Sequence, residues 1–145
     1  MSASAAPGRA VTARGSCLCG AVRYRVEGPL RPVVACHCVQ CRKTSGNFVA
    51  ATSALQEDVI LEREDGLRWY ESSAQARRGF CGVCGSSLFW ATSDSARLSL
   101  HAGALDEAEG LSLIGHIFCA DKGGYYEIAD GLPQRPGDDA KLTTQ

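Results

Sequence analysis

Short runs in which hydrophobic and polar residues alternate, separated by turn-forming residues, are the main pattern along this chain. The clearest run is "AVRYRVEG" at residues 21–28, where Val22, Tyr24 and Val26 alternate with charged residues. Side chains of a β-strand point alternately to its two faces, so this run predicts a strand with one buried face and one solvent-facing face.

Further short strands are predicted wherever β-branched and aromatic residues gather between glycine, proline, aspartate or serine. These segments are 48–52, 59–61, 67–70, 87–90, 97–102, 116–119 and 125–128. No long stretch keeps the 3.6-residue period of an amphipathic helix, and one helical turn is expected near residues 40–45. The pattern predicts a mostly β fold, with antiparallel β-sheets in a β-sandwich-like arrangement and little helix.

The length of 145 residues suits a single domain with one hydrophobic core. We expect this domain to cover residues 15–133. Residues 1–14 are rich in alanine and serine and are expected to form a flexible leader. The polar residues 134–145 are expected to form a flexible tail.

Composition and charge exclude several classes of partner. The chain has 15 basic and 16 acidic side chains, for a net charge of -1. This balance creates no global field that would attract nucleic acid or anionic lipid, so neither nucleic acid nor a membrane is an expected partner. The apolar runs are too short for a membrane span, and the N-terminal residues lack the hydrophobic region of a secretory signal, so the expected location is cytoplasmic.

The cysteines change this picture from an ordinary β-domain to a candidate metal protein. Seven of the eight cysteines form three groups in sequence: Cys17 and Cys19; Cys36, Cys38 and Cys41; Cys81 and Cys84. Thiols stay reduced in the cytosol, so closely spaced cysteines there indicate metal or redox chemistry rather than disulfides. Cys119 stands alone in the apolar segment "HIFCA", where a cysteine is most often a small core residue.

Two arrangements can divide these seven thiols between metal ions. In the first, the outer two groups form a closed four-thiolate site, and the middle group forms a three-thiolate site with one open position. In the second, Cys38 and Cys41 join the last group in a zinc ribbon, which leaves three thiols without a role. The first uses all seven thiols and follows the rule that structural zinc is fully ligated by protein while catalytic zinc keeps an open position. Spacing alone leaves both arrangements possible.

The middle group could also be closed by a fourth protein ligand, which would make it a second structural site. The candidates are His37, His116 and Cys119. His37 is a poor candidate, because both of its neighbours in sequence are expected ligands and its side chain should point away from the metal that they share.

Six sequence motifs together resemble a known family. They are "GSCLCGAVRYRV", "CHCVQCRKTSG", "RRGFCGVCGSSLFW", "HAGALD", "HIF" and "DGLP", in this order. They are similar to the motifs of the glutathione-dependent formaldehyde-activating enzyme family, which also includes centromere protein V-like domains. The resemblance covers about residues 15–133 and implies a zinc-bearing, mostly antiparallel β fold that contains a zinc ribbon.

The resemblance also implies a function and a set of ligands. It assigns Cys17, Cys19, Cys81 and Cys84 to a structural zinc ion, and Cys36, Cys38 and Cys41 to a catalytic one, giving two Zn²⁺ per chain. The implied activity is that of a carbon–sulfur lyase, which combines glutathione with formaldehyde to give S-(hydroxymethyl)glutathione. Glutathione and a small aldehyde are therefore the expected substrates.

The donor set suits this chemistry. A zinc ion with three thiolate ligands is a weak Lewis acid, which disfavours activation of water and favours binding of a thiol as a nucleophilic thiolate. The resulting complex is negatively charged, and Arg42 and Lys43 directly follow the last ligand. We expect these two residues to bind glutathione, with Arg77, Arg78 and Lys122 as second candidates.

Three hypotheses for function are carried forward. The leading one is a zinc-dependent lyase acting on glutathione and formaldehyde or another small aldehyde. The second is an enzyme of the same fold that acts on a different small thiol-reactive substrate. The third is a non-catalytic zinc-binding module that contacts a macromolecule.

Overall fold

The computed structural model describes residues 9–138, and most of its elements are β-strands. The strands are β1 (Ala13–Ser16), β2 (Arg23–Val26), β3 (Val33–Cys36), β4 (Val49–Leu55), β5 (Val59–Arg63), β6 (Leu67–Glu71), β7 (Ala76–Cys81), β8 (Ser87–Thr92), β9 (Arg97–His101), β10 (Leu105–Ala108) and β11 (Leu113–Ile117). One α-helix, α1 (Val39–Ser45), and the short 3₁₀ helices η2 (Gln56–Asp58), η3 (Ala102–Ala104) and η4 (Cys119–Asp121) complete the described elements. The mostly β prediction is confirmed, and α1 lies where a helical turn was expected.

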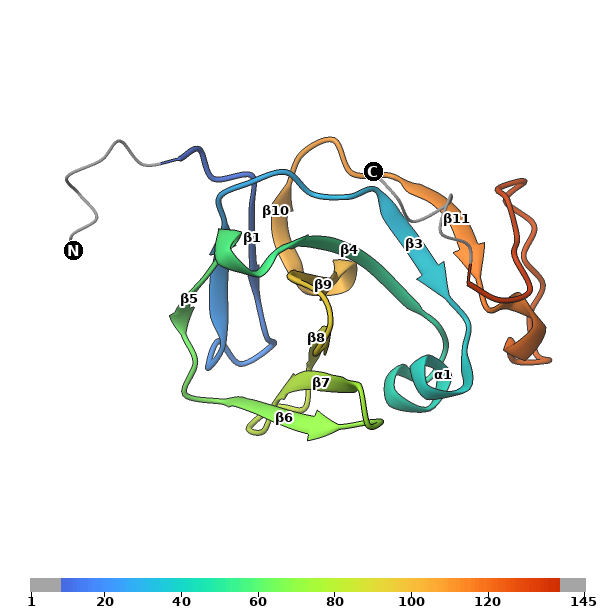
Figure 1. Cartoon of the computed structure of the whole chain (residues 1–145), viewed down its shortest axis with the longest axis horizontal. Coiled ribbons are helices and arrows are strands. Elements are labelled where there is room, and N and C mark those ends of the chain that lie inside the picture. The colour runs from blue at the N-terminus through green and yellow to red at the C-terminus, as the bar shows by residue number, and fades with distance from the viewer. Residues whose placement is uncertain (1–8, 139–145) are drawn as a thin grey trace.

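The strands form two sheets. The smaller sheet has the order β10-β1-β2-β5, and the larger has the order β11-β3-β4-β9-β8-β7-β6. Neighbouring strands are antiparallel, as expected, with the exception of β11, which pairs with β3 in parallel. Figure 1 shows the smaller sheet on the side of the N-terminus, with β3 and β11 on the opposite side and β6 and β7 below.

The hydrophobic core lies where β2 meets the larger sheet. Val22, Tyr24 and Val26 are at most 1% exposed, which confirms the buried face predicted from their alternation. Tyr24 contacts Phe89 of β8, with ring centroids 5.1 Å apart, and Leu100 of β9 packs in the same cluster. Burial of each such side chain contributes about 2 kcal/mol relative to exposure.

One predicted strand is wrong. Residues 125–128 form no strand, because the edge of β11 that could accept a partner is occupied by a later segment. The amide of His116 donates to the carbonyl of Pro133, and the amide of Arg135 donates to the carbonyl of His116, each at 2.9 Å. Tyr126 packs instead against His37 in the loop before α1, and Tyr125 packs against Tyr126.

The end of β11 also differs from the expected strand at 116–119. The strand stops at Ile117, because Phe118 adopts a left-handed backbone conformation with φ of 55°. Cys119 then begins η4 and is half-buried, so it is not the core strand residue that was expected.

The described structure extends into both expected tails. β1 begins at Ala13, two residues before the expected start of the domain, and Arg9 forms a 2.5 Å ion pair with buried Asp58. At the other end, the amide of Phe118 donates to the carbonyl of Gly137 at 3.0 Å. The rest of the expected leader and tail, residues 1–8 and 139–145, lies outside the described residues. Within the described part, no helix has the length and apolar character that crossing a membrane requires.

Candidate functional site

Two clusters of cysteine sulfurs stand out in the structure. One contains Cys17, Cys19, Cys81 and Cys84, and the other contains Cys36, Cys38 and Cys41, with the sulfur atoms of each cluster within 4.8 Å of one another. All these thiols are free of disulfides. The grouping is the arrangement that uses all seven thiols, and we call the two sites the four-cysteine cluster and the three-cysteine cluster.

The four-cysteine cluster has spacings that suit a tetrahedral metal ion. It lies between the β1–β2 turn, which carries Cys17 and Cys19, and the β7–β8 turn, which carries Cys81 and Cys84. The sulfur of Cys19 is 3.7 Å from that of Cys17 and 3.8 Å from that of Cys81. Zinc–sulfur bonds of about 2.3 Å in a tetrahedron place neighbouring sulfurs about 3.8 Å apart, so the donor set fits zinc.

Backbone amides and a hydroxyl prepare this cluster for thiolates. The amide of Val22 donates to the sulfur of Cys17 at 3.2 Å, and the amide of Val83 donates to the sulfur of Cys81 at 3.4 Å. Ser86 hydrogen-bonds with Cys84 and is the main cause that lowers the pKa of the Cys84 thiol to about 5. Hydrogen bonds to a charged group favour its ionised form, so the turns stabilise the ligand form of cysteine.

The three-cysteine cluster is built by the change from strand to helix. Cys36 ends β3, Cys38 caps the N-terminus of α1, and Cys41 lies in its first turn. The amide of Cys41 donates to the sulfur of Cys38 at 3.3 Å, so a thiol takes the place of the usual capping hydroxyl. Gly46 then ends α1 in a left-handed conformation with φ of 89°. This short turn brings three sulfurs that are close in sequence to one point.

Two histidines near the three-cysteine cluster are engaged elsewhere. Nδ1 of His37 hydrogen-bonds with the hydroxyl of Tyr126, and Nε2 of His37 lies 2.9 Å from Nδ1 of His116. Nε2 of His116 lies 2.7 Å from a carboxylate oxygen of Asp130. An ionised carboxylate only accepts, so His116 Nε2–H donates to Asp130, His37 Nε2–H donates to His116, and Tyr126 donates to His37. The network ties the segment around residues 126–130 to the loop that carries the cysteines.

A buried arginine faces the three-cysteine cluster. Nη1 and Nη2 of Arg78 lie 4.0 Å and 3.9 Å from the sulfur of Cys41, and Nη2 also donates to Gln40 at 3.3 Å. The hydrogen bond from Cys36, together with Cys38 and the charge of Arg78, lowers the pKa of Cys41 to about 6, and the same pairing raises the pKa of Cys36. Cys41 is therefore the member of this pair that loses its proton first.

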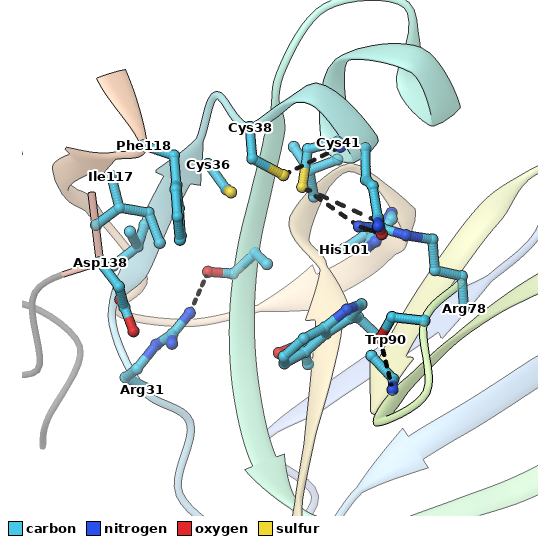
Figure 2. Close-up of a pocket in the computed structure, with 17 residues that line it drawn as sticks. Arg31, Cys36, Cys38, Cys41, Arg78, Trp90, His101, Ile117, Phe118 and Asp138 are labelled. Carbon is cyan, nitrogen blue, oxygen red and sulfur yellow. Dashed lines mark hydrogen bonds between the residues drawn. The ribbon is translucent and has the colours of Figure 1, made fainter. Parts of the chain in front are cut away.

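A pocket of about 490 Å³ opens beside the three-cysteine cluster. Its walls come largely from one face of the larger sheet. On β9, Ser99 and His101 line the pocket while Leu98 and Leu100 pack in the core, as the alternation of a strand requires. Figure 2 shows the three sulfurs along one side of the pocket, with Arg78 beside Cys41 and Arg31 on the other side, near Asp138.

The basic residues in this pocket differ from those expected first. Arg42 and Lys43 lie on α1, half-buried and exposed respectively, and are not among the residues that line the pocket. Their role in binding glutathione stays a prediction. The arginines that line it are Arg78, which was a second candidate, and Arg31, which was missed.

The other second candidates lie away from the pocket lining. Arg77 stacks over the ring of Trp69 at 4.0 Å, and Lys122 donates to the carbonyl of Tyr126 at 2.5 Å. His101 was missed as a site residue, although its alternation with Leu98 and Leu100 placed it opposite the core. Arg31 lies in "PLRPV", which carries no recognisable motif.

Comparison with known proteins places the chain among related sequences. Residues 12–121 match the family described as glutathione-dependent formaldehyde-activating enzyme. The chain is 29% identical over 119 residues to an uncharacterized lyase of Schizosaccharomyces pombe, a match that covers 80% of this chain and 85% of that protein. A protein of Halomonas elongata, provisionally named a glutathione-dependent formaldehyde-activating enzyme, is 32% identical over 83 residues, covering 52% of this chain and 53% of that protein. A crystal structure of a Rhodobacter sphaeroides protein shares the fold, with a TM-score of 0.54, 22% identity and coverage of 83% of this chain and 98% of that chain.

Proposed function

We propose a function on the premise that the chain belongs to the glutathione-dependent formaldehyde-activating enzyme family. The chain is then a carbon–sulfur lyase that combines glutathione with formaldehyde in the pocket beside Cys36, Cys38 and Cys41. The observation that carries this proposal is the position of the pocket, which is lined by all three cysteines of the three-cysteine cluster. Three protein thiolates leave one position of a tetrahedral ion for a substrate.

We assign zinc to both clusters, two ions per chain. The four-cysteine cluster completes a tetrahedron with protein ligands alone, which is the arrangement of structural zinc. A zinc ion in the three-cysteine cluster supplies a position at which a substrate thiol binds as a thiolate near neutral pH. Because these thiols must stay reduced, the cytoplasm is the proposed location.

Arg78 and Arg31 give the pocket the charge that an acidic thiol requires. Arg78 is buried against Cys41, where its positive charge offsets the negative charge that accumulates when another thiolate joins three cysteines. Arg31 lies across the pocket and binds a carboxylate of glutathione, in competition with its present neighbour Asp138. Arginine suits this role because its planar guanidinium matches a carboxylate in geometry.

The size of the pocket supports a small-molecule substrate. Pockets for drug-sized ligands have volumes of about 300–1,000 Å³, and the volume of about 490 Å³ lies within this range. Trp90 and Val34 provide apolar walls, which exclude water from the side chain that reacts. A tripeptide thiol fits such a site, whereas a macromolecule would need an extended surface.

Exchange spectroscopy tests the proposal directly. Glutathione and ¹³C-formaldehyde equilibrate with S-(hydroxymethyl)glutathione in water, and the zinc-loaded protein should accelerate the exchange between these species in NMR spectra. Arg31→Ala should weaken glutathione binding in calorimetry, while zinc content stays unchanged. Exchange at the uncatalysed rate, with glutathione bound, would support a different thiol-reactive substrate. Failure to bind glutathione as well would support the non-catalytic zinc module.

A further inference from the structure

His101 places an unpartnered polar atom at the edge of the same pocket. It ends β9, pairs with Ala51 of β4, and is 9% exposed. Its Nε2 atom is buried and has no hydrogen-bond partner among the described residues. The side chain lines the pocket together with Arg78 and the three cysteines, and Figure 2 shows it near Cys41 and the guanidinium of Arg78.

An unsatisfied buried nitrogen is costly in a stable fold. Buried polar atoms almost always have a hydrogen-bond partner, and a missing partner costs about 1–3 kcal/mol. The cost is relieved if a substrate in the pocket supplies the missing donor. A thiol S–H and the O–H of a hydroxymethyl group are both such donors.

The surroundings of His101 keep its imidazole neutral. Burial and then the positive charge of Arg78 lower the pKa of His101 to about 4, while a hydrogen bond with the backbone of Ser87 acts in the opposite direction. The ring therefore offers a free lone pair at neutral pH. Once protonated beside Arg78, it would be a stronger acid than an ordinary imidazolium and would pass the proton on more readily.

We propose that Nε2 of His101 carries the proton of the reaction: it accepts the proton that the substrate thiol loses and returns it to the oxygen of the new hydroxymethyl group. This inference rests on the proposed function and adds a catalytic residue to it. In the reverse direction, Nε2 accepts the hydroxyl proton as the carbon–sulfur bond breaks.

The step balances without another reagent. The S–H bond of the thiol breaks, and its proton moves to Nε2 of His101. The sulfur lone pair forms the bond to the aldehyde carbon, and the π electrons of the carbonyl move to oxygen. The proton on Nε2 then moves to that oxygen, which restores the neutral imidazole and leaves the hydroxymethyl thioether as the product.

Other groups near the pocket are poorly placed for this task. His37 and His116 hydrogen-bond with each other and with Tyr126 and Asp130, so their nitrogens are occupied. Among the described residues that line the pocket, the other ionisable groups are the three cysteines, two arginines and Asp138. Asp138 lies near Arg31, on the side away from Arg78.

The test is His101→Gln, with Glu107→Gln, at an exposed residue of β10 outside the pocket lining, as the control. A glutamine oxygen can accept a hydrogen bond close to the position of Nε2 but cannot carry a proton. The variant should keep two zinc ions and bind glutathione with a Kd within about threefold of wild type. It should lose on the order of 100-fold in enzyme-catalysed exchange, the smaller end of general acid–base contributions. Glu107→Gln should exchange at nearly the wild-type rate.

The outcomes separate this inference from the proposed function. If wild type does not accelerate exchange, the proposed function fails first. If wild type accelerates it and His101→Gln does so to within threefold, the proton-carrying role of His101 is overturned while the proposed function stands.

A second measurement tests the role of His101 even if His101→Gln does not fold. In wild type with ¹⁵N-labelled histidine, glutathione and formaldehyde should shift the Nε2 resonance of His101, the histidine outside the His37–His116 pair. An unchanged resonance at saturating substrate would also overturn the role.

Discussion

Replacing one cysteine in each cluster separates a metal site that holds the fold from one that serves the pocket. The two variants are Cys84→Ala and Cys38→Ala. Cys84 belongs to a cluster whose members come from residues 17 to 84, so only the folded chain brings its four sulfurs together. The cluster with Cys38 spans residues 36 to 41, and an unfolded chain can also gather such neighbouring thiols around a metal ion. Binding to the unfolded state cancels part of the stabilisation, so the first cluster contributes far more to folding.

The expected magnitudes differ by a factor of about three. Structural zinc supplies about 10–16 kcal/mol of free energy that is also folding free energy, so each of four ligands accounts for about 2.5–4 kcal/mol. In a domain of this size, a change of 1 kcal/mol shifts Tm by about 4 °C, so Cys84→Ala should lower Tm by about 10–16 °C. Cys38→Ala removes the cap of α1, which contributes about 1 kcal/mol, and should lower Tm by about 4 °C.

Thermal unfolding followed by circular dichroism, with zinc measured by elemental analysis, provides the assay. Wild type should hold two zinc ions, and Cys38→Ala should lose glutathione binding while it stays folded at 25 °C. Equal losses of Tm in the two variants would refute the reasoning, because they would mean that the three-cysteine cluster is also closed by the protein. A single zinc ion in wild type would refute the assignment of two sites.

Three further predictions address the pocket and its supports. Arg31→Ala should raise the Kd for glutathione about tenfold in calorimetry at low salt. This increase should exceed the increase caused by changing both Arg42 and Lys43 to alanine. A larger increase in the double variant would mean that Arg42 and Lys43 are the binding residues. Asp130→Ala should speed the release of one zinc ion to a chromophoric chelator, because Asp130 accepts a hydrogen bond from His116 in the network that fixes the loop with the three cysteines. Release of both ions at the wild-type rate would contradict this prediction. The lowered pKa of His101, about 4 against about 6.5 when unfolded, means that the unfolded chain binds the extra proton first as pH falls. The contribution of His101 to stability should therefore fall by about 3 kcal/mol between pH 6.5 and 4. Denaturant titrations should show a smaller total drop in His101→Gln than in wild type, and equal drops would contradict this contribution.

The parts of the site that were predictable from sequence are local. The three cysteines of the middle group lie within six residues, so a turn into a helix is enough to bring their sulfurs together. The buried face of Val22, Tyr24 and Val26 likewise follows from alternation within one strand. In both cases the information lies in residues that are neighbours in the chain.

The parts that were not predictable depend on contacts between distant segments. Arg31 reaches the pocket only because β3 and β4 pair beside it, and Ala51 accepts its hydrogen bond at 2.7 Å. Residues 125–128 have the composition of a strand, yet the place beside β11 is taken by residues 133–135. Local propensity does not determine which of two nearby segments pairs with the edge strand of a sheet.

The parallel pairing of β3 with β11 has a consequence for the order of assembly during synthesis. The four-cysteine cluster needs the chain only as far as Cys84, so its metal and the strands around it can come together early. The wall of the pocket formed by Ile117 and Phe118 arrives with β11, the last strand of the larger sheet. Pairings between distant segments form late because closing a long loop costs entropy first. In a nascent chain, the loop with Cys36, Cys38 and Cys41 thus stays open to solvent, and to an incoming metal ion, until β11 packs beside it.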